Sequence, residues 1–124
     1  MAPRMENEKR DLAQRTKDFA LQVIRFFPKL RRTPEVQILG KQLLRAATSV
    51  GANYREACHG RSKAEFIAKC GDSLREIEET GYWLELLTES ELGNPEQLKP
   101  LREECRELTA IFVTVLKRAK ENPS

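Results

Sequence analysis

Three helix-start signals divide this chain into four segments, and they constrain its fold more than any other feature. Thr33-Pro34-Glu35 places an N-cap hydroxyl before a proline whose missing N–H costs nothing in the first turn. Ser62-Lys63-Ala64-Glu65 has the pattern of a capping box, and Asn94-Pro95-Glu96 combines an N-cap with a proline. With a first segment that ends at Phe27-Pro28, these signals predict helices near residues 7–27, 34–58, 63–90 and 95–121.

Apolar residues recur in each segment in steps of three and four, the spacing of one helix face. The fourth segment has Leu98, Leu101, Cys105, Leu108, Phe112, Val115 and Ala119. The third has Phe66, Cys70, Leu74, Ile77, Gly81, Leu84 and Leu87. The second has Val36, Leu39, Leu43, Ala47, Val50 and Tyr54, and the first has Leu12, Thr16, Phe19, Val23, Phe27 and Leu30. Since 124 residues suffice for one core, the sequence predicts a single all-α domain, an antiparallel up-down-up-down four-helix bundle.

Small residues on the second segment would let a neighbouring backbone come close: Ala46, Ala47, Ser49, Gly51 and Ala52. Asn53 lies three residues after Val50, at the edge of the apolar face. If its amide is buried, Asn53 needs hydrogen-bond partners such as Ser73 or Ser49.

Several classes of protein are excluded by what the sequence lacks. Its apolar runs are far shorter than a membrane span, and the charged segment 1–15 has no apolar region typical of a secretion signal. We therefore expect a cytoplasmic protein with no membrane partner. Cys58, Cys70 and Cys105 form no CxxC pair, which predicts reduced thiols. His59 is the only histidine, so we expect no metal and no cofactor.

Charge is distributed unevenly along the chain. Residues 29–69 carry nine Lys/Arg against three Glu, whereas residues 72–107 carry four Lys/Arg against eleven Asp/Glu. On a helical wheel, basic residues form a stripe along the outward face of the second segment, and this stripe continues past the turn that follows the segment. Its basic members are the predicted nucleic-acid-binding residues: Lys41, Arg45, Arg55, His59, Arg61 and Lys63. Such a stripe suits phosphate contacts, but no aromatic residue interleaves it, so base stacking is not expected.

Two other uses of this basic stripe remain open from the sequence. The stripe is either a solvated face or a contact between copies of the chain. An acidic stripe on the third segment offers matching partners for the second of these: Glu65, Asp72, Glu76 and Glu79.

An aromatic pair lies on the back of the third segment. Tyr82, Trp83 and Leu86 point away from the apolar face formed by Ile77 and Leu84. Exposed aromatic residues are enriched at protein interfaces, so we expect these three residues to form a subunit contact. Ile38, on the outward side of the second segment, would extend this contact.

Catalysis finds no suitable arrangement of residues. The adjacent carboxylates of Glu78 and Glu79 point to different helix faces and lie in the charged exterior, which does not suit an acid–base pair. Cys58 and His59 lack an orienting Asn or Asp. We predict that the protein is not an enzyme and has no catalytic residues.

The central sequence resembles a known family. Residues 45–69 (RAATSVGANYREACHGRSKAEFIAK) and 79–87 (ETGYWLELL) are similar to the bacterial "four helix bundle protein" family, whose members are known from intervening sequences of large-subunit ribosomal RNA genes. The resemblance implies a homopentamer. It also implies a relationship to the accessory variability determinant of diversity-generating retroelements, a basic pentamer that binds nucleic acid and the retroelement reverse transcriptase.

Two functions therefore compete. The first is a homo-oligomeric bundle, pentameric by resemblance, that binds DNA, RNA or a nucleic-acid enzyme such as a reverse transcriptase through its basic surface. The second is a self-assembling interaction scaffold with no nucleic-acid binding. The accessibility of Arg45, Arg55 and Arg61 distinguishes them.

Overall fold

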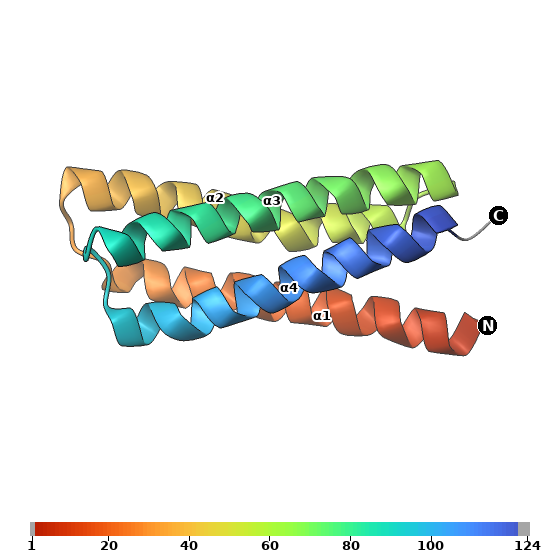
Figure 1. The fold of residues 1–124 in the computed structure, drawn as a ribbon, viewed down its shortest axis with the longest axis horizontal. Helices are drawn as coiled ribbons and strands as arrows, with labels where there is room; N and C mark the ends of the chain where they lie inside the picture. The colour runs from red at the N-terminus through yellow and green to blue at the C-terminus, as the bar shows by residue number, and fades with distance from the viewer. Residues whose placement is uncertain (1, 122–124) are drawn as a thin grey trace.

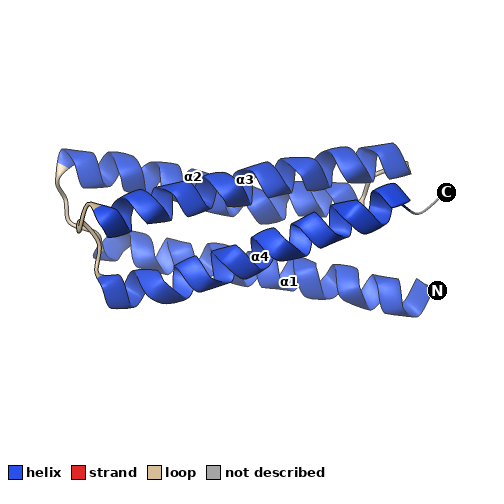
Figure 2. Ribbon diagram, in the orientation of Figure 1, coloured by secondary structure: helices blue, strands red, loops and turns tan. Residues whose placement is uncertain are grey.

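Four long helices make up the protein. The computed structural model describes the backbone of residues 2–121 and the side chains of residues 7–121. The helices are α1 (Ala2–Phe26), α2 (Pro34–Cys58), α3 (Lys63–Glu89) and α4 (Pro95–Glu121), and a short 3-10 turn, η1 (Phe27–Lys29), follows α1. They alternate in direction (Figure 1), and the described residues contain no strand (Figure 2). The predicted all-α four-helix bundle is confirmed, although α1 begins five residues earlier than the predicted residue 7.

The predicted caps on α3 and α4 form, with one change of partner. Ser62 Oγ accepts a hydrogen bond from the N–H of Glu65 at 3.1 Å. The Glu65 carboxylate does not return to Ser62 but accepts from the N–H of Arg61 at 2.6 Å, so it covers the residue before the cap. At α4, Asn94 Oδ1 accepts from the N–H of Glu96 at 2.8 Å.

The predicted hydroxyl cap of α2 is wrong. Helix α2 begins at Pro34, directly after Thr33, but no N–H of the helix donates to the Thr33 side chain. The Glu35 carboxylate instead accepts hydrogen bonds from its own N–H and from the Thr33 hydroxyl, and both lower the pKa of Glu35. The hydroxyl is oriented toward this carboxylate, as its donated hydrogen bond requires, and in that orientation its oxygen accepts no N–H of the first turn.

The core runs the length of the bundle and is nearly all aliphatic and aromatic. Its largest fully buried side chains are Phe19, Val23, Val36, Leu43, Val50, Tyr54, Ile77, Leu84, Leu87, Leu98, Leu108 and Phe112. The rings of Tyr54 and Phe112 meet edge to face, with centroids 5.7 Å apart. Leu116 is buried in the last turns of α4, where the sequence indicated Val115 and Ala119, both of which are half-buried.

The buried face of α3 is rotated from the predicted one. Ser73 and Thr80 are fully buried, while Leu74 and Gly81 are only half-buried. The two hydroxyls have partners: Ser73 Oγ donates to the carbonyl oxygen of Val50 at 2.9 Å, and Thr80 Oγ1 donates to that of Glu76 at 2.7 Å. Because both hydroxyls are hydrogen-bonded, their burial costs little free energy. A prediction that counts only apolar residues along the sequence therefore misses this face of α3.

Small residues on α2 allow close packing, as expected. Ala46, Ala47 and Gly51 are buried, and a Cβ atom built on Gly51 would lie 3.1 Å from Thr16 Oγ1 on α1. Asn53 is only half-buried, so its amide does not need the two serines, which bond elsewhere: Ser73 donates to Val50, and Ser49 Oγ donates to the carbonyl oxygen of Arg45 at 2.7 Å.

The four helices do not pack equally. Helices α2 and α3 contact each other most extensively. Among neighbouring helices, α1 and α4 contact each other least, and they diverge toward the end that holds both termini (Figure 1). Arg15 bridges the two: its Nε and Nη2 donate to the Glu104 carboxylate at 2.7 and 2.9 Å, and Nη2 also reaches Glu107 Oε1 at 2.5 Å. These hydrogen bonds raise the pKa of Arg15.

Cys70 and Cys105 are buried free thiols, as predicted, and Cys58 is half-buried and also free. Burial raises the pKa of Cys70 to about 12 and that of Cys105 to about 11. Both thiols are therefore overwhelmingly protonated at neutral pH, which suits a packing role rather than a nucleophilic one.

Glycine-to-alanine substitutions test the packing of individual helix faces. Gly71→Ala meets no atom within 4 Å, and Gly81→Ala places its methyl group 3.5 Å from Cys105 Sγ, an ordinary contact. Both should raise the free energy of unfolding by about 0.5–1 kcal/mol because alanine is the better helix former. Gly40→Ala should instead lower it by about 1 kcal/mol, since its methyl group would lie 2.8 Å from Leu30 Cδ1 and 3.0 Å from Phe27 Cε1. Urea denaturation measures all three, and a stabilising Gly40→Ala would contradict the packing of η1 against α2.

Candidate nucleic-acid and subunit interface

The predicted basic stripe is on the surface. Lys41, Arg45, Arg55 and His59 are exposed along α2 and at its end, Arg61 is exposed in the following turn, and Lys63 is half-buried at the start of α3. The residues do not form one continuous cationic face, because their surroundings differ along the helix.

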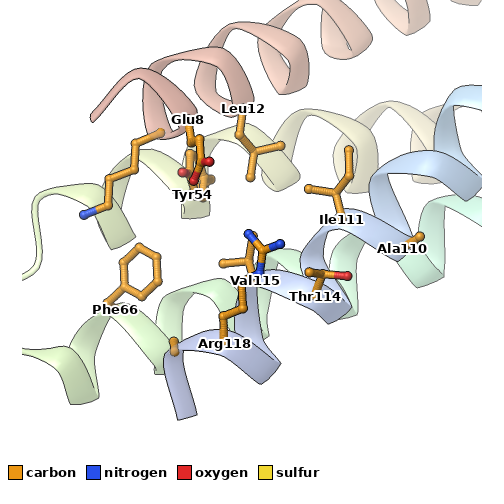
Figure 3. Close-up of a pocket in the computed structure, with 11 residues that line it drawn as sticks. Glu8, Leu12, Tyr54, Phe66, Ala110, Ile111, Thr114, Val115 and Arg118 are labelled. Carbon is orange, nitrogen blue, oxygen red and sulfur yellow. The ribbon is translucent and has the colours of Figure 1, made fainter. Parts of the chain in front are cut away.

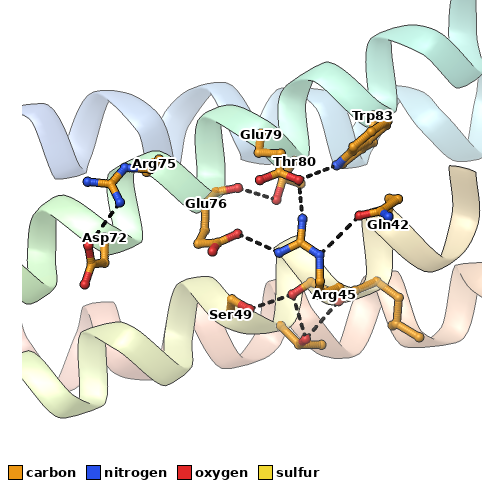
Figure 4. Close-up of polar contacts among 11 residues, drawn as sticks. Gln42, Arg45, Ser49, Asp72, Arg75, Glu76, Glu79, Thr80 and Trp83 are labelled. Carbon is orange, nitrogen blue, oxygen red and sulfur yellow. Dashed lines mark hydrogen bonds and ion pairs between the residues drawn. The ribbon is translucent and has the colours of Figure 1, made fainter.

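Arg45 is neutralised within its own chain (Figure 4). Its guanidinium pairs with Glu76 of α3, with Nη1 3.3 Å from Oε1, and Nη2 contacts the Glu79 carboxylate. Its Nε also donates to Gln42 Oε1 at 3.2 Å. These glutamates belong to the acidic stripe that the sequence offered as partners for a neighbouring copy. The pairing is intramolecular, which leaves Arg45 less available for phosphate than the sequence indicates.

Four of the five remaining basic residues lie around the turn between α2 and α3. Arg55, His59, Arg61 and Lys63, here called the turn cluster, have no ion-pair partner among residues 7–121. His59 Nδ1 lies 2.7 Å from the carbonyl oxygen of Arg55 and donates to it. Lys41 lies about 21 Å from Arg55 along the helix, so it is not part of the cluster. The turn cluster is the larger part of the predicted stripe that forms no ion pair among the described residues. Lys41 is also exposed without such a pair, but it lies apart from the cluster.

Lys69 is close to the turn cluster but already paired. Its Nζ lies 2.7 Å from Glu56 Oε1 and 4.0 Å from Asp72 Oδ2. These contacts raise the pKa of Lys69, with the hydrogen bond to Glu56 contributing most.

The predicted subunit contact on α3 is partly exposed to solvent and partly packed against the core. Tyr82 is 52% exposed, whereas Trp83 and Leu86 are half-buried. Trp83 packs against the core, its Nε1 donates to Glu79 Oε2 at 3.0 Å, and its ring centre lies 5.3 Å from that of Tyr82. The helical wheel places Trp83 on the back of α3, but its ring is half-buried because the buried face of α3 includes Thr80, three residues before it.

Ile38 extends the same surface onto α2. It is the most exposed large apolar side chain described, at 63%. It precedes Arg45 by seven residues, and Trp83 follows Glu76 by seven, so the Arg45–Glu76 contact places Ile38 and Trp83 at a similar level on one face. Ile38, Tyr82, Trp83 and Leu86 are called the α2–α3 patch below.

Within the described part of the chain, no group of His, Cys, Asp and Glu side chains is arranged to hold a metal ion. No helix described is long and apolar enough to cross a membrane. Cys58 and His59, the candidate nucleophile pair, lie at the end of α2, where the His59 ring is turned back onto its own helix.

Comparisons with known proteins identify relatives of this bundle. The family model described as "23S rRNA-intervening sequence protein" matches residues 8–114. A crystal structure of a protein of unknown function from Bacteroides thetaiotaomicron VPI-5482, assigned to the S23 ribosomal protein family, is 32% identical. The match covers 88% of this chain and 97% of that one, with a TM-score of 0.81. No curated protein matches the chain.

Charge substitutions at Arg45 test whether its ion pairs are intramolecular in solution. Arg45→Ala should lower the free energy of unfolding by less than about 1 kcal/mol, because the pairs are half-exposed. Arg45→Glu should cost more, since it faces two carboxylates, and raising NaCl from about 0.05 to about 0.5 M should reduce the difference. Lys41→Glu, on the same face without such partners, is the control. Equal losses for Arg45→Glu and Lys41→Glu would contradict the described contact.

Proposed function

The chain belongs to the family of 23S rRNA-intervening sequence proteins, and from that premise we propose that it is a non-enzymatic, homo-oligomeric bundle that binds nucleic acid through the turn cluster. The resemblance in residues 45–69 and 79–87 makes a pentamer the proposed assembly. It also makes a nucleic-acid enzyme, such as a retroelement reverse transcriptase, the proposed protein partner.

The availability of the turn cluster is the observation that supports nucleic-acid binding most directly. Arg55 and Arg61 are exposed and Lys63 is half-buried around the turn between α2 and α3, and none of them has an ion-pair partner among the described residues. Arginine and lysine at such a site neutralise phosphates and release counterions, which favours binding regardless of sequence. A ring of copies would present the cluster several times, so a weak site on each chain would bind more tightly through avidity.

A second candidate function rests on a different observation. Arg45 is occupied by Glu76 and Glu79, and the α2–α3 patch lies beside this ion pair. An interaction scaffold that assembles through this patch, with no nucleic-acid binding, would use the same surface without needing the turn cluster.

Salt-dependent binding tests the nucleic-acid proposal. The protein should shift duplex DNA or structured RNA at low salt, and its affinity should fall steeply as salt rises. Replacing Arg55 and Arg61 by Gln should weaken binding and flatten the salt dependence by about one unit of slope for each phosphate that is no longer neutralised. Replacing Arg31 and Arg32 by Gln, at the other end of the bundle, is the matched control because both side chains are exposed there. No binding by the wild type, or equal losses in both double variants, would favour the scaffold.

Light scattering after size exclusion tests the assembly. The wild type should elute with about five times the 14.3 kDa mass of one chain. Changing both Ile38 and Tyr82 to Glu should dissociate it while keeping the helicity, since both side chains are mostly exposed. Ile24→Glu is the control, because Ile24 is 45% exposed on α1, away from the patch. A monomeric wild type rejects assembly, and dissociation by Ile24→Glu alone places the contact on α1 instead.

A further inference from the structure

A cavity of about 780 Å³ opens where α1 and α4 diverge, at the end of the bundle that holds both termini. All four helices contribute to its lining. Its apolar wall consists of Leu12, Phe66, Ala110, Ile111, Val115 and Ala119 (Figure 3). Cavities of this size and composition are typical of sites for small apolar or amphipathic molecules.

Cations stand beside the apolar wall. Lys9 and Arg118 both line the cavity, and Figure 3 shows the Arg118 guanidinium directed into it. Lys9 Nζ lies 5.0 Å from the centre of the Phe66 ring. Arg118 has no hydrogen-bond or ion-pair partner among the described residues, and two cations line the cavity against the single carboxylate of Glu8. The lining therefore complements a molecule that has an apolar body and one negative charge.

The cavity runs along α4, and this constrains the shape of the molecule that it can hold. Its lining on α4 runs from Ala110 to Ala119, about 14 Å along the helix axis. Ile111 and Val115 occupy the length of this wall, and Arg118 lies near its end. An unbranched chain with a terminal anion matches this arrangement, because the chain can follow the apolar wall while the anion reaches Arg118.

We propose that the α1–α4 cavity binds a single-chain carboxylate, such as a free fatty acid, with its alkyl chain against Leu12, Ile111 and Val115 and its carboxylate at Arg118 and Lys9. The guanidinium donates to the carboxylate oxygens, and burial of the chain supplies the remaining affinity. This site is separate from the turn cluster and does not depend on nucleic-acid binding.

Titration calorimetry with octanoate, decanoate and dodecanoate, each below its micelle concentration, tests the proposal. Affinity should rise about threefold to fourfold for each methylene buried. Decanol, of equal length without the charge, should bind about threefold to tenfold more weakly than decanoate, because it cannot form the charge-assisted hydrogen bonds.

Variants locate the site. Arg118→Gln should lower decanoate affinity about threefold to tenfold and leave decanol affinity unchanged, since it removes only the charged contact. Lys99→Gln, exposed at the far end of α4, is the matched control and should change neither. Ala119→Phe fills the cavity and should abolish binding of both ligands, with its helicity checked by circular dichroism. Arg118 is exposed, so its variant remains informative if Ala119→Phe does not fold.

Three results would overturn the proposal. The first is affinity that does not depend on chain length. The second is an equal effect of Arg118→Gln and Lys99→Gln. The third is binding to phosphatidylglycerol vesicles without binding to monomeric decanoate, which would indicate a membrane-surface contact instead of a ligand cavity.

Discussion

The hydrogen bond from Ser73 Oγ to the carbonyl oxygen of Val50 fixes how α2 and α3 lie against each other. Both residues are fully buried, and this bond joins positions 23 residues apart. A shift by one helical turn would leave the buried hydroxyl without this partner, at a cost of about 1–3 kcal/mol. The same register brings Arg45 opposite Glu76 and Glu79, so the core hydrogen bond and the surface ion pairs require the same placement of α2 against α3.

Local signals in the sequence predict the helices well, because a cap or a proline acts within its own turn. Pro34, Lys63 and Pro95 begin helices as Thr33, Ser62 and Asn94 indicate, even though the Thr33 hydroxyl donates to Glu35 rather than capping. Helix faces are harder to predict. Ser73 and Thr80 are buried with satisfied hydroxyls, and a count of apolar residues assigns them to the surface.

At the candidate site, the sequence does not show which side chains of neighbouring helices contact each other. A helical wheel places Arg45 correctly on an outward stripe, but it contains no information about the neighbouring helix. The sequence identifies Glu76 and Glu79 as acidic partners for the basic stripe. Only the relative position of α2 and α3 shows that they pair with Arg45 of their own chain. Trp83 differs, since its indole N–H donates to Glu79, four residues earlier on the same helix, a spacing that the sequence itself contains. The α1–α4 cavity has no local signal, because it arises from the angle between the first and last helices.

The weak contact between α1 and α4 has a consequence for the order in which the bundle assembles. Most other contacts join helices that follow one another in the chain, whereas Arg15 reaches Glu104 across 89 residues. Closing such a long loop costs more conformational entropy than closing a helical hairpin. We therefore expect the α2–α3 hairpin to form early during folding and the contact between α1 and α4 to form last. Because α1 contacts its neighbouring helices least, we expect local opening of the native state to begin at this contact, and amide hydrogens of α1 should exchange with solvent before those of α2 and α3.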